Sequence, residues 1–225
     1  MQKEEGNMRE ELQCPRITWN GKIVGYGGNQ EWFSGEFQRL AGCGSVTGSN
    51  LAAIYAASDE NMKPLYDPKT DPYCKEEYLK LMETMYAYMK PGFMGYPLIG
   101  RFARDFVRYA GNRGILLSPE KLFLPKKKEQ SLNFILGAIK AGDPVAFLIL
   151  RHPARWLRED NWHWVTITGY DEENHTLIWS NCGEREVISW DQLFDPRLKY
   201  YVGMVRFQRF AEHKKKEGSL CTNWC

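Results

Sequence analysis

Residues 41–55 read AGCGSVTGSNLAAIY, and this stretch decides the fold. Its small and apolar residues predict a buried helix over residues 44–57. Gly48 would destabilise such a helix relative to alanine, so we expect another element to approach closely there. Cys43 stands between two glycines where this helix begins. Unpaired backbone N–H groups and the positive end of the helix dipole favour a thiolate there, and the thiolate is the nucleophilic form.

The segments around this helix predict further helices and a series of strands. Asn20-Gly21 lies between two short apolar runs, which is the strongest short signal for a β-hairpin. The continuous apolar run at 144–150 is typical of a strand buried on both faces. Amphipathic spacing predicts helices over residues 74–89, 98–110 and 131–141. Turn signals separate strands predicted over residues 163–168, 176–180, 185–189 and 201–210. Early helices followed by a strand-rich second half predict an α+β fold with an antiparallel sheet.

The order of these segments predicts one domain with an extension at each end. Residues 1–16 are polar and charged and are expected to form an N-terminal extension. Residues 17–210 hold the predicted domain, and residues 211–225 a C-terminal tail. Between about 58 and 125 the pattern changes to amphipathic helices. We expect this part to be a helical insertion that follows the helix of Cys43.

Composition excludes several classes of partner. The 225 residues carry a formal net charge of only +2, so we expect no nucleic-acid partner. No apolar stretch reaches the length of about 18–20 residues that spans a bilayer, so we expect no membrane partner. The N-terminus lacks the apolar core of a signal peptide, and the six cysteines are scattered. A cytoplasmic location with free thiols is therefore expected.

The cysteines outside residues 41–55 give no sign of a metal site. Cys221 and Cys225 are closely spaced, but the nearest histidine is the single His213 in a lysine-rich stretch. Zinc sites usually pair such a couple with a second couple of ligands. We therefore expect a frayed tail there, with no metal and no cofactor. Cys182 is expected to pack as a small apolar residue.

The chain offers the groups that a catalytic Cys43 thiol would need. A cysteine nucleophile needs a base, a group that orients the base, and a donor for the oxyanion. His163 opens a predicted strand and is the natural base, because imidazole exchanges protons near neutral pH. Asn181 ends the next strand and could accept the imidazole N–H. The backbone N–H of Cys43 could bind the oxyanion together with Gln38, or with the more distant Gln30.

These residues resemble those of the papain-like cysteine peptidase superfamily. The resemblance rests on Gly42-Cys43-Gly44 at the start of a helix, His163-Trp164-Val165 running to Gly169-Tyr170-Asp171, and Ser180-Asn181. Within the superfamily, the chain is most similar to the bacteriocin-processing, double-glycine leader peptidase-like group of bacterial proteins. The likeness spans about residues 30–210. It implies a papain-like fold, in which the central helix with the nucleophile packs on a C-terminal antiparallel sheet.

The resemblance also implies a role for each site residue. Cys43 would be the nucleophile, His163 the general base and acid, Asn181 the orienting residue and Gln38 the oxyanion donor. The glutamine of the family usually stands six residues before the cysteine, where this chain has Phe37. Either the turn is one residue shorter, or Gln30 serves instead, or the oxyanion hole is incomplete.

With these roles, the resemblance implies a cysteine hydrolase. It would cleave a peptide or isopeptide bond of a peptide or protein substrate through a thioester intermediate. Two alternatives stay open: a catalytically silent peptide-binding module of the same fold, and a cysteine-dependent acyl transferase of small-molecule biosynthesis. The sequence leaves the cleavage specificity and the oligomeric state open.

Overall fold

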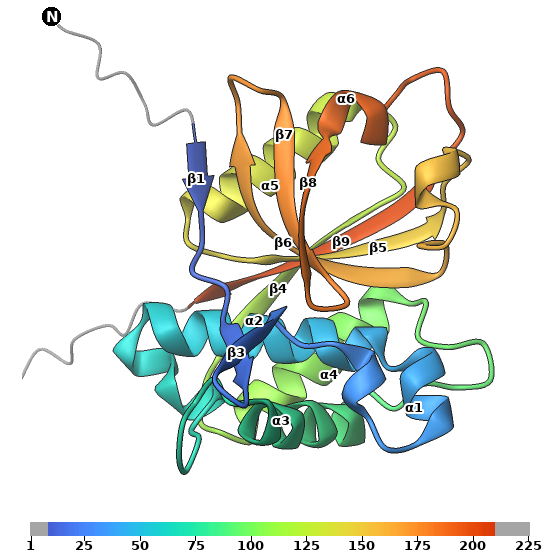
Figure 1. Cartoon of the computed structure of the whole chain (residues 1–225). Helices are drawn as coiled ribbons and strands as arrows, with labels where there is room; N and C mark the ends of the chain where they lie inside the picture. The colour runs from blue at the N-terminus through green and yellow to red at the C-terminus, as the bar shows by residue number, and fades with distance from the viewer. Residues whose placement is uncertain (1–8, 210–225) are drawn as a thin grey trace, which may run out of the picture.

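The computed structural model describes residues 9–209, and these residues form an antiparallel sheet with helices on both of its faces (Figure 1). The elements, in chain order, are β1 (Arg9–Glu11), β2 (Arg16–Trp19), β3 (Lys22–Tyr26), η1 (Gln30–Trp32), α1 (Glu36–Ala41), α2 (Cys43–Ser58), η2 (Glu60–Leu65), α3 (Lys75–Tyr88), α4 (Ile99–Gly111), β4 (Leu117–Phe123), α5 (Lys128–Lys140), β5 (Val145–Arg151), η3 (Arg155–Leu157), β6 (His163–Asp171), β7 (Thr176–Asn181), β8 (Glu184–Ser189), α6 (Trp190–Leu193) and β9 (Tyr201–Arg209). The predicted mixture of helices with an antiparallel sheet is confirmed.

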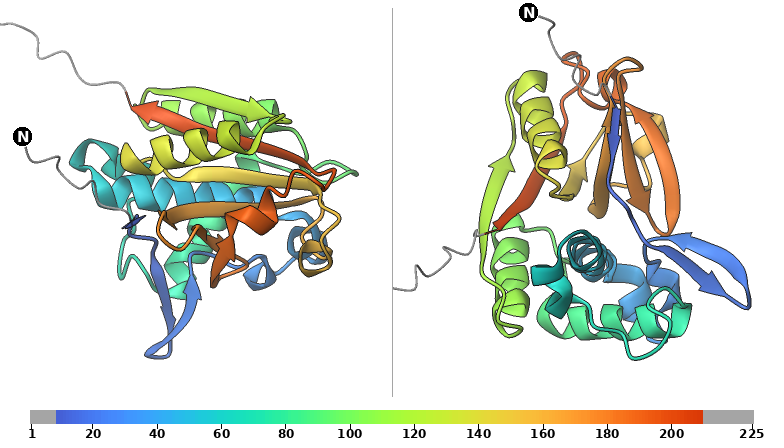
Figure 2. Two further views of the ribbon diagram at one scale, coloured as in Figure 1. Left: turned by 90° about the horizontal axis from the view of Figure 1, so that it is seen from above. Right: turned by 90° about the vertical axis from the view of Figure 1, so that its left-hand side faces the viewer.

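The main sheet has the strand order β4-β9-β5-β6-β7-β8, and β1 pairs with β6. Every strand pair in it is antiparallel. The continuous apolar strand β5 lies inside this sheet and alternates between two cores. Ala146 and Leu148 face the core shared with α2, whereas Phe147 and Ile149 face the core shared with α5. The prediction of a strand buried on both faces is therefore confirmed, and Figure 2 shows α5 on the face opposite α2.

Helix α2 lies between the sheet and α3 (Figure 2). Its first thirteen residues, 43–55, are all buried, as expected for a helix enclosed on every side. A Cβ atom on Gly48 would lie 2.9 Å from Met89 Sδ and 3.0 Å from Met85 Cγ. The close approach predicted at Gly48 is therefore confirmed, and the neighbour is the end of α3.

The predicted hairpin at Asn20-Gly21 is present as β2 and β3. Both turn residues have positive φ angles, 49° for Asn20 and 72° for Gly21. This backbone is that of a type I′ turn, which asparagine and glycine adopt most readily. The hairpin pairs as a separate sheet of two strands and stands beside α2 and α3 in Figure 1.

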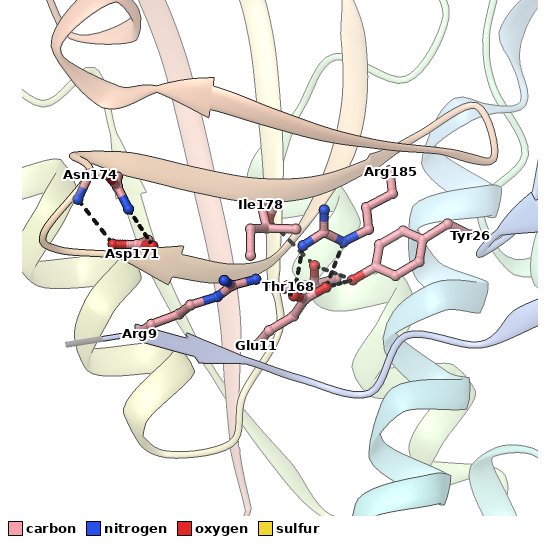
Figure 3. A network of polar contacts seen from close by, with 8 residues as sticks. All are labelled: Arg9, Glu11, Tyr26, Thr168, Asp171, Asn174, Ile178 and Arg185. Atoms are coloured by element: carbon pink, nitrogen blue, oxygen red, sulfur yellow. Dashed lines mark hydrogen bonds and ion pairs between the residues drawn. The ribbon is translucent and has the colours of Figure 1, made fainter. Parts of the chain in front are cut away.

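Strand β1 was not expected, because residues 1–16 were predicted to be an extension. It pairs with residues 169–171 of β6, just beyond the point where the start of β5 pairs with Ile167. A polar cluster holds it there: Arg185 Nη2 donates to Glu11 Oε2 at 2.7 Å, and Tyr26 Oη donates to Glu11 Oε1 at 2.9 Å (Figure 3). The three residues of β1 are all charged, so the sequence gives no apolar pattern that predicts a strand. The strand forms because of the partners it pairs and bonds with, not because its side chains are buried.

Strand β4 also differs from the prediction of a helical insertion over residues 58–125. That segment does contain α3 and α4, close to the predicted bounds. Its last part, however, pairs along its whole length with β9 and forms one edge of the main sheet. Pro119 and the adjacent charged residues Glu120 and Lys121 are typical of an edge strand and obscure the apolar pattern. The segment therefore completes the sheet and is not wholly helical.

Parts of the sequence-based predictions concern residues outside those described. They are the tail at 211–225 with Cys221 and Cys225, and residues 1–8 of the N-terminal extension. Within residues 9–209, the helices are too short or too polar to cross a bilayer.

Candidate active site

Cys43 is the first residue of α2, immediately after α1. A Cβ atom on Gly42 would lie 2.3 Å from the Gln38 carbonyl oxygen, and one on Gly44 would lie 2.8 Å from the Tyr96 ring. No side chain fits at either position without displacing these neighbours. The two glycines therefore allow the chain to turn from α1 into α2 and to pack tightly around the thiol. Cys43 itself is 8% exposed.

His163 and Asn181 lie side by side because β6 and β7 are antiparallel neighbours. His163 begins β6 and Asn181 ends β7, so both are at the same end of the pair. The distance between His163 Nε2 and Asn181 Oδ1 is 2.9 Å, a hydrogen bond. The end of β6 that carries His163 also meets the start of α2, where His163 and Cys43 border the same small cavity. The structure thus brings together the three predicted residues.

The Cys43 thiol and the His163 imidazole change each other's pKa. Burial alone would raise the pKa of Cys43, but the His163 ring and the backbone N–H groups of Trp164 and Gly44 lower it below its usual value. Burial alone would lower the pKa of His163, but Cys182 and Cys43 hold it well above its usual value. These opposite shifts favour a thiolate paired with an imidazolium.

Two carboxylates hold the other end of the Asn181 side chain. Asn181 Nδ2 donates to Asp160 Oδ1 at 3.0 Å and to Glu186 Oε1 at 3.3 Å. The second oxygen of Glu186 accepts a hydrogen bond from Trp179 Nε1 at 2.7 Å. Asp160 comes from the loop before β6 and Glu186 from β8. Neither carboxylate was predicted from the sequence, because neither forms a recognisable motif with Asn181.

Cys182 contacts His163, whereas the sequence favoured packing over a role as a second thiol of the site. Its Sγ lies 3.7 Å from His163 Nε2. Cys182 and Gly183 form the two-residue turn between β7 and β8, with φ angles of 46° and 81°. Cysteine is unusual in this left-handed conformation. The turn aims a second thiol at the same imidazole ring.

Gln38 and Gln30 differ in their relation to the site. Gln38 lies on α1, where its Oε1 accepts a hydrogen bond from the Gly35 backbone N–H at 3.2 Å. Gln30 instead borders the small cavity at the start of α2 that Cys43 and His163 also border. Its buried Oε1 has no hydrogen-bond partner within residues 9–209. Between the two glutamines that the sequence left open, Gln30 is the one beside Cys43.

Asn50 joins the elements that carry the site. Its Nδ2 lies 3.2 Å from the hydroxyl oxygens of both Thr166 and Ser180, on β6 and β7. Its Oδ1 accepts hydrogen bonds from the Gly28 N–H at 2.9 Å and from the Tyr78 hydroxyl at 2.8 Å. All the hydrogen bonds of this buried amide are therefore made within the fold. A polar amide two helical turns after Cys43, among small apolar residues, was the signal that could have identified it.

A cavity much larger than the one beside Cys43 lies elsewhere. It lies at the C-terminal end of α2, between Ala53, Ala56 and the proline-rich loop at 64–73. With a rise of about 1.5 Å per helical residue, this cavity is roughly 15–20 Å from Cys43 along the helix. It contains none of the residues described above, so the thiol and the imidazole rather than the cavity size identify the candidate site.

Comparison with known proteins adds nothing to this geometry. No protein-family model and no curated protein matches the chain.

Proposed function

We propose that the protein is a papain-like cysteine hydrolase that cleaves a peptide or isopeptide bond. The observation that carries the proposal is the arrangement around His163, which borders the same small cavity as Cys43 and whose Nε2 lies 2.9 Å from the Asn181 amide oxygen. A thiol at a helix start, a base and an orienting amide are the parts that nucleophilic thiol catalysis requires. The position of α2 against an antiparallel sheet supports the papain-like assignment.

In the proposed reaction, the Cys43 thiolate attacks the carbonyl carbon of the scissile bond. The developing oxyanion lies at the start of α2, where the backbone N–H of Cys43 is free to donate to it. Gln30 supplies the second donor through its Nε2, because its side chain borders the same cavity. His163 then protonates the leaving amine, which leaves an acyl group on Cys43. A water molecule, deprotonated by His163, hydrolyses this thioester.

The direct test is the reactivity of the six cysteines toward iodoacetamide at pH 7, with each cysteine followed by mass spectrometry of its peptide. We expect Cys43 to react at least about tenfold faster than the other five, because the thiolate is the reactive form. Replacing His163 with alanine should remove this advantage. A Cys43 that reacts no faster than the other thiols contradicts the proposal.

The reaction type needs a second measurement. The protein is incubated with a diverse peptide pool, and products are compared with those of the Cys43→Ala variant. Cleavage that is absent from the variant supports hydrolysis. Products that form only when an amine is added indicate acyl transfer instead. Peptides that bind without being cleaved indicate a binding module of the same fold.

A further inference from the structure

We propose that Asp160 and Glu186 are positioning residues, which hold the Asn181 carboxamide with its oxygen toward His163. The inference rests on the proposed thiol–imidazole site and extends it by two residues. Asn181 Nδ2 has two hydrogens, and the two carboxylate oxygens at 3.0 and 3.3 Å accept one each. Both carboxylates are half-buried, and they come from different elements. The amide is therefore held from two sides.

The carboxylates matter because the two ends of a carboxamide have nearly the same shape. Asn181 rotated by 180° would fit the same space, with its NH2 group toward His163 and its oxygen toward the carboxylates. An ionised carboxylate only accepts hydrogen bonds, so the rotated amide would oppose lone pairs to lone pairs. Asp160 and Glu186 therefore exclude the rotated orientation.

The orientation of the amide decides which nitrogen of His163 carries the proton. With the oxygen of Asn181 toward Nε2, that nitrogen must be the N–H donor. The other ring nitrogen is then left to exchange a proton with Cys43. In the rotated orientation, the NH2 group would require Nε2 to accept, and the neutral ring would carry its proton on the nitrogen needed as a base. Two residues that do not touch Cys43 thus control whether its base is available.

The two carboxylates are themselves held in place. Glu186 lies opposite Trp179 in the β7–β8 pairing, and its second oxygen accepts the indole N–H of that residue. Asp160 lies in the loop between β5 and β6. Beside it, the Asn161 side chain accepts from the His152 backbone N–H at 2.5 Å and donates to the Arg158 carbonyl at 3.0 Å. Neither carboxylate depends on the other for its position.

The test reverses the donors and acceptors. In Asn181→Asp a third carboxylate faces Asp160 and Glu186, so we expect repulsion and loss of the hydrogen bond to His163. In the triple variant Asp160→Asn/Glu186→Gln/Asn181→Asp, two amides donate to an aspartate that still accepts from His163. The triple variant should therefore recover what the single variant loses. The matched control is Glu159→Gln/Glu184→Gln, which removes exposed carboxylates from the same loop and strand.

The first readout is the rate at which iodoacetamide alkylates Cys43 between pH 5 and 9. The groups facing His163 are Cys43 and Cys182 directly, and Asp160 and Glu186 through Asn181. Because two of these groups are thiols, the alkylation of Cys43 is followed separately by peptide mapping. Each unit by which the pKa of Cys43 rises lowers its thiolate fraction at pH 6 about tenfold. We expect a loss of this order in Asn181→Asp and in Asp160→Asn/Glu186→Gln. The triple variant and the control should stay within about threefold of wild type.

The second readout is the nitrogen chemical shift of the His163 ring, recorded at a pH above the raised pKa of His163, where the ring is neutral and the shift reports its tautomer without any catalytic activity. Wild type and triple variant should carry the proton on Nε2, and the Asp160→Asn/Glu186→Gln variant should show a mixture. A triple variant that is as impaired as Asn181→Asp overturns the positioning role, even if peptides are cleaved. Conversely, tautomers that change as expected in a protein that cleaves nothing overturn the proposed hydrolysis alone.

Discussion

At the scale of single residues, the environment of Cys43 depends on neighbours that leave no room for side chains beside it. The Tyr96 ring covers Gly44, and it is fixed at two points. Its hydroxyl donates to Asp105 Oδ2 at 2.6 Å, and its carbonyl accepts from Trp164 Nε1 at 2.6 Å. Trp164 follows His163 on β6. Tyr96 therefore contacts both the start of α2, through its ring, and the strand that carries the base, through its backbone carbonyl.

The packing of Gly44 can be tested with alanine. Gly44→Ala would place a methyl group 2.8 Å from Tyr96 Cδ1, inside van der Waals contact. We expect a loss of about 1–3 kcal/mol in the free energy of unfolding, measured by urea denaturation, as for other overpacked sites. Gly100→Ala on α4 is the control, because nothing lies within 4 Å of its added methyl group. Equal stabilities of the two variants would show that Tyr96 moves away freely.

The pKa shifts at Cys43 and His163 predict a pH dependence. A lowered pKa means that the Cys43 thiol stays ionised at lower pH than an ordinary thiol, so its alkylation rate should begin to rise at lower pH. In His163→Ala, burial still raises the pKa of Cys43, but the imidazole that lowers this pKa most is gone. The alkylation profile of Cys43 should therefore move to higher pH, beyond that of an ordinary cysteine. A profile that does not move would show that the imidazole does not stabilise the thiolate.

The sequence indicated the residues on element ends better than those in connecting segments. Cys43, His163 and Asn181 were selected because a helix start and two strand ends have positions that chain patterns reveal. The choice between Gln38 and Gln30 was not accessible in this way. It depends on α1, which uses Gln38 to bond Gly35, and on the turn that carries Gln30 to the cavity. Asp160, in the loop before β6, was missed for the same reason, and Glu186 was missed because it lies within β8 rather than at its end.

At the scale of elements, the turn between β7 and β8 combines an unfavourable backbone with a functional side chain. Cys182 occupies the first position of a type I′ turn at φ 46°, where asparagine is preferred. Its thiol is nevertheless the group that raises the pKa of His163 most. Cysteine at this position therefore stabilises the protonated imidazole, although its backbone conformation is unfavourable.

This conflict predicts opposite effects of one substitution. Cys182→Asn should increase the free energy of unfolding by about 0.5–1 kcal/mol, because Asn-Gly is the favoured sequence for the turn. The same change removes the thiol from His163 and should lower the pKa of that histidine, measured by NMR titration. Cys74→Asn, at the start of α3, is a control for loss of a thiol elsewhere. A less stable Cys182→Asn variant would contradict the strain attributed to the turn.

Strand β1 shows how an element without a sequence pattern is placed. A Cβ atom on Gly169 would lie 2.6 Å from the Glu10 carbonyl oxygen, so only glycine lets β1 approach β6. Gly169→Ala should therefore detach β1 and increase hydrogen exchange at the Leu12 amide, which donates to the Thr168 carbonyl. Exchange in β5 should stay unchanged. If Leu12 remained as protected as in wild type, β1 would not depend on this contact.

At the scale of the whole molecule, α2 and the sheet are joined at both ends of the helix. At its start, the site residues and Asn50 connect it with β6 and β7. At its far end, Arg209 of β9 lies 3.8 Å from Asp59, just after α2, and 3.4 Å from Asp143, just before β5. Asp143 is 4% exposed, and its Oδ1 is close enough to Arg209 for an ion pair but forms no hydrogen bond.

Asp143 predicts how the stability of the fold changes with pH. Burial raises its pKa to about 6, against the opposing effect of Arg209 and Arg206. Because the folded state then binds a proton more tightly than the unfolded state, the free energy of unfolding should fall as pH rises from about 4 to 6. A shift of about two units corresponds to roughly 2–3 kcal/mol. Asp143→Asn does not titrate, so relative to wild type it should gain most of this amount, about 2 kcal/mol, between pH 4.5 and 7.5 in urea denaturation. The exposed Glu83→Gln variant serves as control, and a constant difference between Asp143→Asn and wild type across this range would contradict the prediction.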